Sequence, residues 1–328
     1  MRVLVTGGAG YIGSVMSGML ADRGHEVLVI DNLSRGHRKA LEDIPLEEID
    51  LLDAPAVTAA CLGFRPGVAM HFAGHSLVDE SVSNPLKYLR ENLAMGLNLL
   101  QGLERADCRA LIFSSSCSIF GVPSVELISE DTPTDPINPY GLSKLLFERI
   151  LCELEKRGRL GFASLRYFNA AGADTVRGLG EDHTPETHLI PRVISAALGK
   201  APAVRIFGTD YPTPDGTCVR DYVHIVDLCD AHLRAMEELN AGARRLVFNV
   251  GIGRGFSVRE VVESVKRVSG VDFTVIEESR REGDPPRLVA SPDRIKAELG
   301  WRPAYTELDE IVSTAWQWHS AHPEGYPG

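Results

Sequence analysis

The sequence predicts an α/β fold, in which a Rossmann-type, doubly wound parallel sheet is joined to a smaller C-terminal α/β domain. Three observations favour this fold class. A glycine-rich turn follows an apolar N-terminal run, short β-branched runs alternate with helical patterns through the first half, and Gly, Pro and Asp become frequent after about residue 170. At 328 residues the chain also exceeds the size at which single cores usually stop growing. We therefore expect a first domain over residues 1–170 and a second over residues 171–328, with some segments of the second returning to the first.

The first half of the chain reads as consecutive β-α-β units. Strands are expected at Val3–Thr6, Val27–Asp31, Val68–Phe72, Leu111–Ser115 and Ala163–Tyr167, and helices at Tyr11–Arg23, Pro85–Arg105 and Pro139–Lys156. In the second half, helices are expected at Leu189–Leu198 and Val226–Leu239, between short strands. Right-handed crossovers bring the carboxyl ends of parallel strands to one edge of the sheet, where ligands bind. Residues that follow these strands are therefore the first candidates for a functional site.

The composition excludes several classes of protein. A net charge of −11 argues against a nucleic-acid partner, although a local arginine cluster can still bind a small anion. No apolar run reaches transmembrane length, and no basic segment with a cleavage site opens the chain, so we expect a cytoplasmic protein with no membrane partner. The six cysteines have no CxxC or other metal-ligand spacing, which predicts reduced, buried thiols and no metal.

A glycine turn links the first expected strand to the first helix. Gly7, Gly10 and Gly13 follow the spacing Gly-x-x-Gly-x-x-Gly. The first permits a tight turn, the second lets backbone N–H groups approach a pyrophosphate, and the third allows close contact between helix and strand. Asp31 ends the next strand, where a carboxylate can bind both ribose hydroxyls and repel a 2′-phosphate. The unit therefore predicts NAD rather than NADP, the alternative being that Asp31 merely caps a loop.

Other segments at the same sheet edge are expected to contact this cofactor. Asp50 and Leu51 could border the adenine, and the loop 72–76 follows another strand, although it could also be an ordinary turn. Arg35 and Arg38 lie close to Asp31 and weaken the exclusion of a 2′-phosphate. The cofactor residues expected from these segments are Gly7, Gly10, Tyr11, Ile12, Gly13, Asp31, Asn32, Leu33, Ser34, Arg35, Gly36, Asp50, Leu51, Phe72, Ala73, Gly74, His75 and Ser76.

A tyrosine and a lysine stand four positions apart in the third expected helix, as Tyr140 and Lys144. An unperturbed tyrosine, with a pKa of about 10, is a poor base at neutral pH, but a nearby ammonium or positive nicotinamide lowers that pKa. Ser116, at the end of a strand, can hydrogen-bond the same substrate oxygen. Together these residues predict removal of a hydroxyl proton beside a hydride acceptor. Taken alone, the pair could equally be a surface tyrosine and a solvated lysine, because residues at i and i+4 meet on any helix.

These motifs together resemble the extended short-chain dehydrogenase/reductase family and, within it, the 4-epimerases of UDP-hexoses. The resemblance extends over nearly the whole chain. The segments that carry it are Gly7–Gly13, Asp31–Asn32, His71–Gly74, Glu80–Val82, Ser114–Gly121, Tyr140–Lys144, Arg166–Asn169, Ile206–Tyr211, Asp215–His224, Arg280–Asp284 and His322–Tyr326. The first half marks the superfamily, whereas Asp215–His224 and the C-terminal tail single out the epimerases.

The resemblance implies that NAD oxidises the sugar transiently at C4, with Tyr140 as the base, and that UDP-galactose and UDP-glucose are interconverted without loss of the cofactor. The first domain would bind NAD and the second the UDP-sugar. By the same match, the cofactor set gains Asn92, Ser114, Tyr140, Lys144, Tyr167 and Phe168. The implied substrate residues are Ser116, Tyr140, Asn169, His188, Leu189, Arg205, Phe207, Arg220, Tyr222, Arg281, Asp284 and Leu288. Arg220 and Arg281 would pair with the pyrophosphate, since guanidinium groups bind phosphate oxygens bidentately. A homodimer would form through the helices Pro85–Arg105 and Pro139–Lys156.

Three positions depart from the family pattern. Ser76 stands where some members carry lysine near the nicotinamide, and Phe120 replaces the usual tyrosine before Gly121. Leu288 occupies a position that is tyrosine in some members and smaller in others, and this side chain affects whether an N-acetyl group fits beside the sugar. Use of UDP-N-acetylhexosamines therefore stays open.

Rival functions remain at this stage. A nucleotide-sugar dehydratase needs an acidic pair beside the strand-end serine, and this chain has Ser116-Cys117-Ser118 there. A 4-epimerase of UDP-pentoses or UDP-uronates is harder to exclude. A non-catalytic dinucleotide sensor would have no use for Tyr140 and Lys144, so their presence counts against it.

Overall fold

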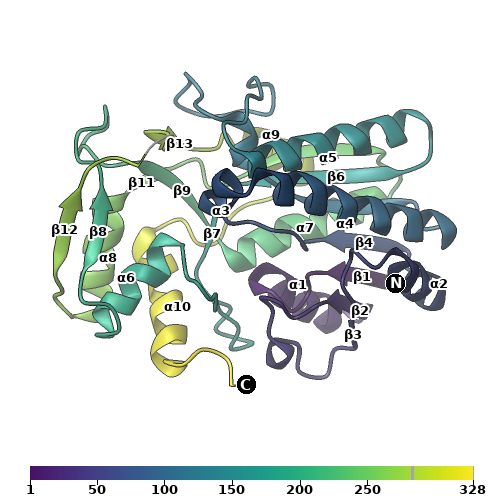
Figure 1. Cartoon of the computed structure of the whole chain (residues 1–328), viewed down its shortest axis with the longest axis horizontal. Helices are drawn as coiled ribbons and strands as arrows, with labels where there is room; N and C mark the ends of the chain where they lie inside the picture. Colours follow the sequence, from purple (N-terminus) through teal and green to yellow (C-terminus); the bar gives the residue numbers. More distant parts are fainter. Residues whose placement is uncertain (282–283, 328) are drawn as a thin grey trace.

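A seven-stranded sheet, in the order β10-β6-β5-β4-β1-β2-β3 and parallel throughout, forms the centre of the larger lobe (Figure 1). The computed structural model describes residues 1–281 and 284–327. The strands of this sheet are β1 (Arg2–Thr6), β2 (Glu26–Asp31), β3 (Leu46–Glu48), β4 (Val68–His71), β5 (Ala110–Ser116), β6 (Gly161–Tyr167) and β10 (Arg245–Val250). The central strands are buried on both faces, which explains why they read as short apolar runs rather than alternating patterns.

Helices cover both faces of this sheet. One face carries α1 (Tyr11–Asp22), α7 (Ile225–Asn240) and α9 (Asp293–Leu299), and the other carries α2 (Ala54–Phe64), α4 (Pro85–Arg105) and α5 (Pro139–Lys156). Strand β1 shows the division, because Val3 and Val5 pack into the first core and Leu4 into the second. Shorter elements complete this lobe: the helix α3 (Val78–Ser83) and the 3-10 turns η1 (Arg38–Leu41) and η2 (Cys117–Phe120).

The smaller lobe has a core of its own. One sheet has the order β11-β9-β13, with β7 also paired to β9, and a second sheet pairs β12 with β8. These strands are β7 (Asn169–Ala171), β8 (Val204–Phe207), β9 (Val219–His224), β11 (Gly255–Ser257), β12 (Val275–Glu278) and β13 (Arg287–Leu288); the helices are α6 (Leu189–Ala197), α8 (Val258–Ser269) and α10 (Leu308–Ala321). Ile194, Val261 and Ile311, one from each helix, are buried together there. Helix α8 begins with a capping box between Ser257 and Glu260, which satisfies two free backbone N–H groups.

The chain passes between the lobes more than once. After β9 it returns to the large sheet as α7 and β10 and then goes back to the smaller lobe (Figure 1). Asp227 of α7 accepts hydrogen bonds from the backbone N–H groups of Ala304 and Tyr305, both at 2.9 Å, and so ties the segment before α10 to the large lobe. The predicted domain boundary between residues 170 and 171 therefore stays a prediction. Strand β10 joins the large sheet, and α7 packs against one face of that sheet.

The predicted α/β class is confirmed. Each strand and helix expected from the sequence is present, with limits that differ by at most two residues. Two strands of the large sheet were not predicted. Strand β3 has only three residues, and β10 lies far along the chain from its neighbour β6. Among the described residues, no helix combines the length and apolarity that a bilayer crossing requires.

Candidate active site

A cleft of about 980 Å³ opens where the carboxyl ends of the parallel strands face the smaller lobe. From the large lobe, its lining includes Gly7 after β1, Asp31 at the end of β2 and Phe72 after β4. From the smaller lobe, it includes Phe207 of β8 and Arg220 of β9. Elements distant in sequence therefore contribute to one cavity, as expected for ligand sites of parallel α/β sheets.

The glycine turn forms one end of the cleft and fits a dinucleotide. A Cβ atom at Gly13 would lie only 2.1 Å from the carbonyl oxygen of Gly7, so the close approach of α1 to the turn requires glycine there. Asp31 accepts hydrogen bonds from the backbone N–H of Ala9 (3.0 Å) and of Leu33 (2.9 Å). The carboxylate thus caps the turn and lines the cleft at once, and burial raises its pKa. The two interpretations of Asp31, as a ligand of the ribose hydroxyls and as a cap of the loop, are therefore compatible.

The start of α5 places the predicted base in the same cleft. Asn138 caps the helix by accepting a hydrogen bond from the N–H of Gly141 (2.8 Å), which puts Tyr140 in the first turn. A Cβ at Gly141 would lie 2.4 Å from the carbonyl oxygen of Ser118, so only glycine lets α5 approach the turn after β5 this closely. Tyr140, Lys144 and Ser116 all line the cleft. The structure therefore brings together the three residues that the sequence singled out for chemistry.

Buried interactions fix Lys144. Its Nζ donates a hydrogen bond to the carbonyl oxygen of Ser114 (2.8 Å) and lies 5.8 Å from the centre of the Tyr140 ring. Burial lowers the pKa of Lys144 to about 8, while the charge of Glu148, one helical turn on, raises it. The ammonium therefore depends on a buried carboxylate to remain charged above neutral pH.

The expected lowering of the Tyr140 pKa is not found in the protein alone. Burial raises this pKa to about 12, a hydrogen bond with Ser116 lowers it, and the neighbouring Cys117 raises it. Burial has this effect because an ionised phenol is poorly solvated in this part of the cleft. The prediction that a nearby ammonium and a bound nicotinamide together lower the phenol pKa stays a prediction.

Glu148 is held by residues of β6. Ser164 donates to its Oε1 (2.9 Å), and Arg166 donates from Nε to Oε1 (3.0 Å) and from Nη2 to Oε2 (2.7 Å). Both side chains of this ion pair are nearly fully buried, with 10% and 6% of their surfaces exposed. Buried ions persist where they are paired and hydrogen-bonded, and the Glu148–Arg166 pair meets both conditions.

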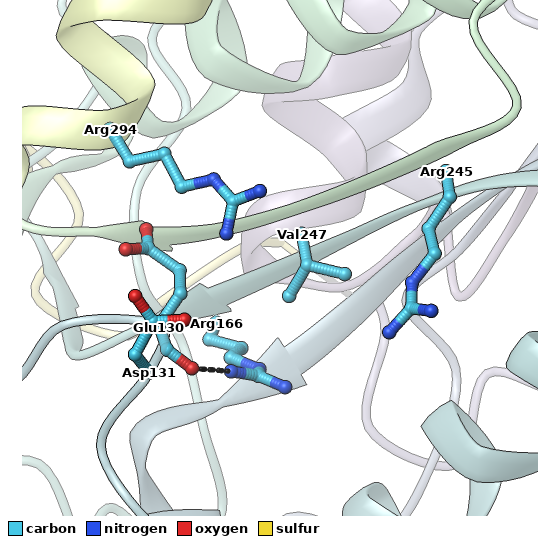
Figure 2. Close-up of a pocket in the computed structure, with 6 residues that line it drawn as sticks. All are labelled: Glu130, Asp131, Arg166, Arg245, Val247 and Arg294. Carbon is cyan, nitrogen blue, oxygen red and sulfur yellow. Dashed lines mark hydrogen bonds between the residues drawn. The ribbon is translucent and has the colours of Figure 1, made fainter.

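Arg166 also borders a second, smaller pocket of about 220 Å³, shown in Figure 2. Its Nη1 donates to the carbonyl oxygen of Glu130 (3.4 Å). The residues lining this pocket are Glu130, Asp131, Arg166, Arg245, Val247 and Arg294. None of the candidate site residues lies here, so this pocket is separate from the cleft.

Charged side chains gather at the other end of the cleft. Arg220 forms an ion pair with Asp284, and Arg281 stacks on the ring of Phe207, with its guanidinium carbon 4.1 Å from the ring centre. Arg205 pairs with Glu278 and also lines the cleft. Leu288 of β13 lies opposite Arg220 of β9 in the sheet register. The cleft therefore offers a glycine turn at one end and several guanidinium groups at the other.

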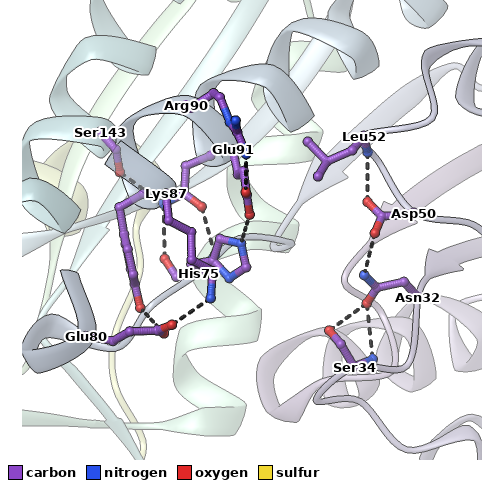
Figure 3. A network of polar contacts seen from close by, with 12 residues as sticks. Asn32, Ser34, Asp50, Leu52, His75, Glu80, Lys87, Arg90, Glu91 and Ser143 are labelled. Carbon is purple, nitrogen blue, oxygen red and sulfur yellow. Dashed lines mark hydrogen bonds and ion pairs between the residues drawn. The ribbon is translucent and has the colours of Figure 1, made fainter. Parts of the chain in front are cut away.

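Three predicted cofactor residues do not line the cleft. Leu33 packs against the core of the large lobe, and Asp50 accepts hydrogen bonds from Asn32 (3.1 Å) and from the N–H of Leu52 (2.8 Å). Asn92 holds the loop after β4, because it accepts from the N–H of His75 (2.8 Å) and donates to its carbonyl oxygen (3.1 Å). Figure 3 shows these contacts around Asp50 and His75. These three side chains support segments that line the cleft.

All other predicted site residues line the cleft. The cofactor group there comprises Gly7, Gly10, Tyr11, Ile12, Gly13, Asp31, Asn32, Ser34, Arg35, Gly36, Leu51, Phe72, Ala73, Gly74, His75, Ser76, Ser114, Tyr140, Lys144, Tyr167 and Phe168. The substrate group there comprises Ser116, Tyr140, Asn169, His188, Leu189, Arg205, Phe207, Arg220, Tyr222, Arg281, Asp284 and Leu288. Their placement is established, whereas the role of each residue stays a prediction.

The sequence analysis gave no role in the site to two polar groups of the cleft. Glu80 pairs with Lys87 (2.6 Å) and accepts from the hydroxyl of Tyr88 (2.8 Å), which braces α3 against α4 (Figure 3). No spacing signals this contact, since it joins side chains of two different helices, α3 and α4.

The second overlooked group lies in the loop before α6. Glu181, His183 and Glu186 line the cleft beside the predicted residue His188. The negative charge of Glu181 raises the pKa of His188 to about 9. The pattern Glu-x-His-x-x-Glu-x-His could have drawn attention to this group.

Comparisons with known proteins extend over almost the whole chain. Residues 3–251 match the model of the NAD dependent epimerase/dehydratase family. The chain is 44% identical over 327 residues, 99% of each chain, to a UDP-glucose 4-epimerase of Lactobacillus helveticus. It is similar to a crystal structure of a UDP-glucose 4-epimerase, with a TM-score of 0.97 and 41% identity over 100% of both chains. A UDP-glucose 4-epimerase from Brucella ovis in complex with NAD gives a TM-score of 0.93 at 44% identity, covering 96% of this chain and 97% of that one.

Substitution of Glu148 by glutamine should destabilise the fold. The change removes the charge that compensates Arg166, and breaking a buried ion pair typically costs about 3–5 kcal/mol. We expect urea denaturation to show a loss of that size in the free energy of unfolding. Glu153→Gln, which breaks an exposed pair with Lys156 on the same helix, is the matched control and should change stability little. Equal losses of unfolding free energy in the two variants would show that the buried pair stabilises the fold no more than the exposed pair does.

Proposed function

The chain belongs to the NAD dependent epimerase/dehydratase family, and we propose that it uses NAD to invert C4 of a UDP-hexose, interconverting UDP-galactose and UDP-glucose. The family resemblance drawn from the sequence is confirmed by the match over residues 3–251. The single observation that carries the proposal is the meeting of Tyr140, Lys144 and Ser116 in a cleft that also contains a dinucleotide turn.

Bound NAD supplies reversible hydride transfer at the sugar carbon. Tyr140 takes the proton of the 4-hydroxyl during oxidation and returns it during reduction, and Ser116 hydrogen-bonds the same oxygen. Lys144, held between the Ser114 carbonyl and the charge of Glu148, places a positive charge near the phenol. Because no net oxidation results, the enzyme has no need to exchange its cofactor during the cycle.

The guanidinium end of the cleft suits the diphosphate of a nucleotide sugar. Arg220 and Arg281 are both within the cleft, and Arg281 is positioned by its stacking on Phe207. Arginine pairs bidentately with phosphate oxygens, so these side chains can hold the nucleotide in place. Between the two hydride transfers the sugar can then rotate and present its other face to the cofactor. Asp284, paired with Arg220, orients that guanidinium.

The rival functions predict different products. A dehydratase needs carboxylic acids beside the strand-end serine, where this structure has Cys117 and Ser118 in the 3-10 turn η2. Incubation with UDP-galactose and no added NAD should yield UDP-glucose if the proposal is right. A 4-keto-6-deoxy sugar would indicate a dehydratase, and absence of turnover with full NAD content would indicate a sensor. A panel of UDP-hexoses, their N-acetyl forms, UDP-pentoses and UDP-uronates, read by NMR, would establish the preferred sugar.

Substitution of Tyr140 by phenylalanine should remove the base while leaving the cleft intact. We expect kcat for UDP-galactose to fall by at least about 10²–10⁴-fold, the usual contribution of a positioned acid–base group. NAD content and UDP affinity should be unchanged, because neither depends on the phenol hydroxyl. Tyr305→Phe, at a tyrosine outside the cleft lining, should keep the wild-type rate. A wild-type rate in Tyr140→Phe would exclude this residue as the base.

Substitution of Arg220 by alanine should weaken the binding of UDP. Truncating one partner of a desolvated charge pair typically costs about 2–5 kcal/mol, so calorimetry should show a large rise in the Kd for UDP. Arg259→Ala serves as the control, since Arg259 pairs with Glu277 away from the cleft. If both variants bind UDP as the wild type does, Arg220 makes no contact with the diphosphate.

We also propose a cytoplasmic homodimer built on α4 and α5. Leu86 and Leu97 lie on one face of α4, three helical turns apart, and their relative exposures are 78% and 47%. Such a stripe would be covered if two copies paired along these helices. Five of the six free cysteines are buried, which agrees with a reducing compartment.

Leu97→Glu should therefore convert a dimer into a monomer, because it places a charge in the apolar stripe. Sedimentation velocity would measure the change. Val176→Glu, which alters an apolar residue that is 89% exposed in the loop between β7 and α6, should leave the dimer intact. A dimeric Leu97→Glu variant, or a monomeric wild type, would contradict the proposed interface.

A further inference from the structure

Four metal-ligating side chains converge in the loop before α6. Glu181, His183, Glu186 and His188, here called the Glu-His cluster, each offer one ligand atom, and these atoms all lie within 4.8 Å of one another. Glu181 is almost fully buried, with 4% of its side chain exposed. The proposed chemistry at Tyr140 makes no use of Glu181, His183 or Glu186, so the convergence calls for another explanation.

The spacing of the ligand atoms suits a tetrahedral metal ion. The Nδ1 atom of His183 lies 3.1 Å from Oε1 of Glu181 and 3.8 Å from Oε2 of Glu186. The Nδ1 atom of His188 lies 3.9 Å from Oε1 of Glu186 and also contacts Oε1 of Glu181. Ligands at about 2.0–2.2 Å from a tetrahedral ion are separated by about 3.3–3.6 Å. Three of the four spacings are close to this range, and an ion would have to separate the His188–Glu181 pair, which is now in direct contact.

The donor set indicates which ion would bind. Two imidazole nitrogens and two carboxylate oxygens suit Zn²⁺, whereas Mg²⁺ and Ca²⁺ prefer oxygen alone. A divalent cation would also neutralise two carboxylates that lie close together at a buried position. Four protein ligands leave no open coordination position, which is typical of a structural site rather than a catalytic one.

Further contacts orient the ligands and anchor their loop. Glu186 accepts hydrogen bonds from its neighbours' backbone, the N–H groups of Thr187 (2.6 Å) and His188 (2.7 Å). Within the same loop, Asp182 accepts from the N–H of Tyr326 (2.9 Å) in the C-terminal tail and pairs with His37 (3.4 Å) of the large lobe. Such supporting contacts accompany metal sites in proteins. The loop therefore touches the large lobe and the chain terminus.

We propose that the Glu-His cluster binds one divalent transition-metal ion, with Zn²⁺ preferred, and that the ion fixes the loop before α6 against the large lobe. Ligation through Nδ1 leaves the other ring nitrogen of His188 free for the substrate. The ion carries no step of the epimerisation, so the proposal stands or falls independently of the proposed function. The alternative is a cluster without a metal ion, in which a protonated His188 forms an ion pair with Glu181.

The test begins with the complete, NAD-containing protein, purified without a polyhistidine tag. After removal of metal by a chelator and dialysis, titration with ZnCl₂ should show one site per chain by calorimetry. Co²⁺ in place of Zn²⁺ should give the visible absorption bands of a tetrahedral ion. Zn²⁺ should raise the thermal midpoint and slow hydrogen exchange over residues 180–188. These measurements need no variant, so they remain decisive if a substituted chain fails to fold.

Variants then assign the site. His183→Gln should lower the Zn²⁺ affinity by at least about 10–100-fold, the loss typical even for residues that only support a ligand. His25→Gln is the matched control, because His25 directly precedes β2, at the amino ends of the parallel strands, whereas the cluster lines the cleft at their carboxyl ends. Absence of Zn²⁺ binding by the wild type, a Co²⁺ complex without tetrahedral bands, or equal Zn²⁺ affinity in wild type and His183→Gln would each overturn the proposal.

Discussion

The candidate site depends on the buried charges that hold α5 against the large sheet. Lys144 reaches the Ser114 carbonyl of β5, and Glu148, one turn later, is bound by Ser164 and Arg166 of β6. These contacts fix the rotation of α5 about its axis and its position on the sheet, and the first turn of α5 contains Tyr140. An apolar contact could press the helix onto the sheet equally well, but it would not fix the rotation as tightly as directional hydrogen bonds do. The position of Tyr140 therefore depends on the buried charged side chains of Lys144, Glu148 and Arg166.

The cleft depends on the repeated passage of the chain between the lobes. Segments of the smaller lobe are tied to the larger one by Asp227 of α7 and by the contact of Asp182 with His37. The dinucleotide turn belongs to the large lobe, whereas Arg220 and Arg281 belong to the smaller one, so the relation between the lobes determines the distance between the turn and these guanidinium groups. Many polar contacts between the lobes make that relation specific.

Much of the larger lobe could be predicted because its signals are local. A strand, a glycine turn and a helix follow one another directly in the chain as β1, the turn and α1, and Tyr140 and Lys144 share a single helix. Strand β10 could not be assigned to the large sheet, because no local pattern tells which of two sheets a strand joins. The pair Glu148–Arg166 was missed for the same reason, since its partners lie in different elements. The Glu-His cluster was missed because the expectation of no metal rested on cysteine spacing, which says nothing about histidine and glutamate ligands.

The raised pKa of Tyr140 shows how the same burial can serve and oppose catalysis. A dry site strengthens every charge interaction with a reacting group, but it also disfavours the phenolate, and in the chain alone the second effect dominates. The resident ammonium is itself weakened by burial, which lowers the pKa of Lys144 to about 8. An additional positive charge is therefore needed before Tyr140 can lose its own proton near neutral pH and serve as a base. An oxidised nicotinamide has such a charge and the reduced form lacks it, so the basicity of Tyr140 would rise and fall with the redox state of the cofactor. The phenolate would then be the base while hydride leaves the sugar, and the resulting phenol would be the acid while hydride returns, as a reversible inversion requires.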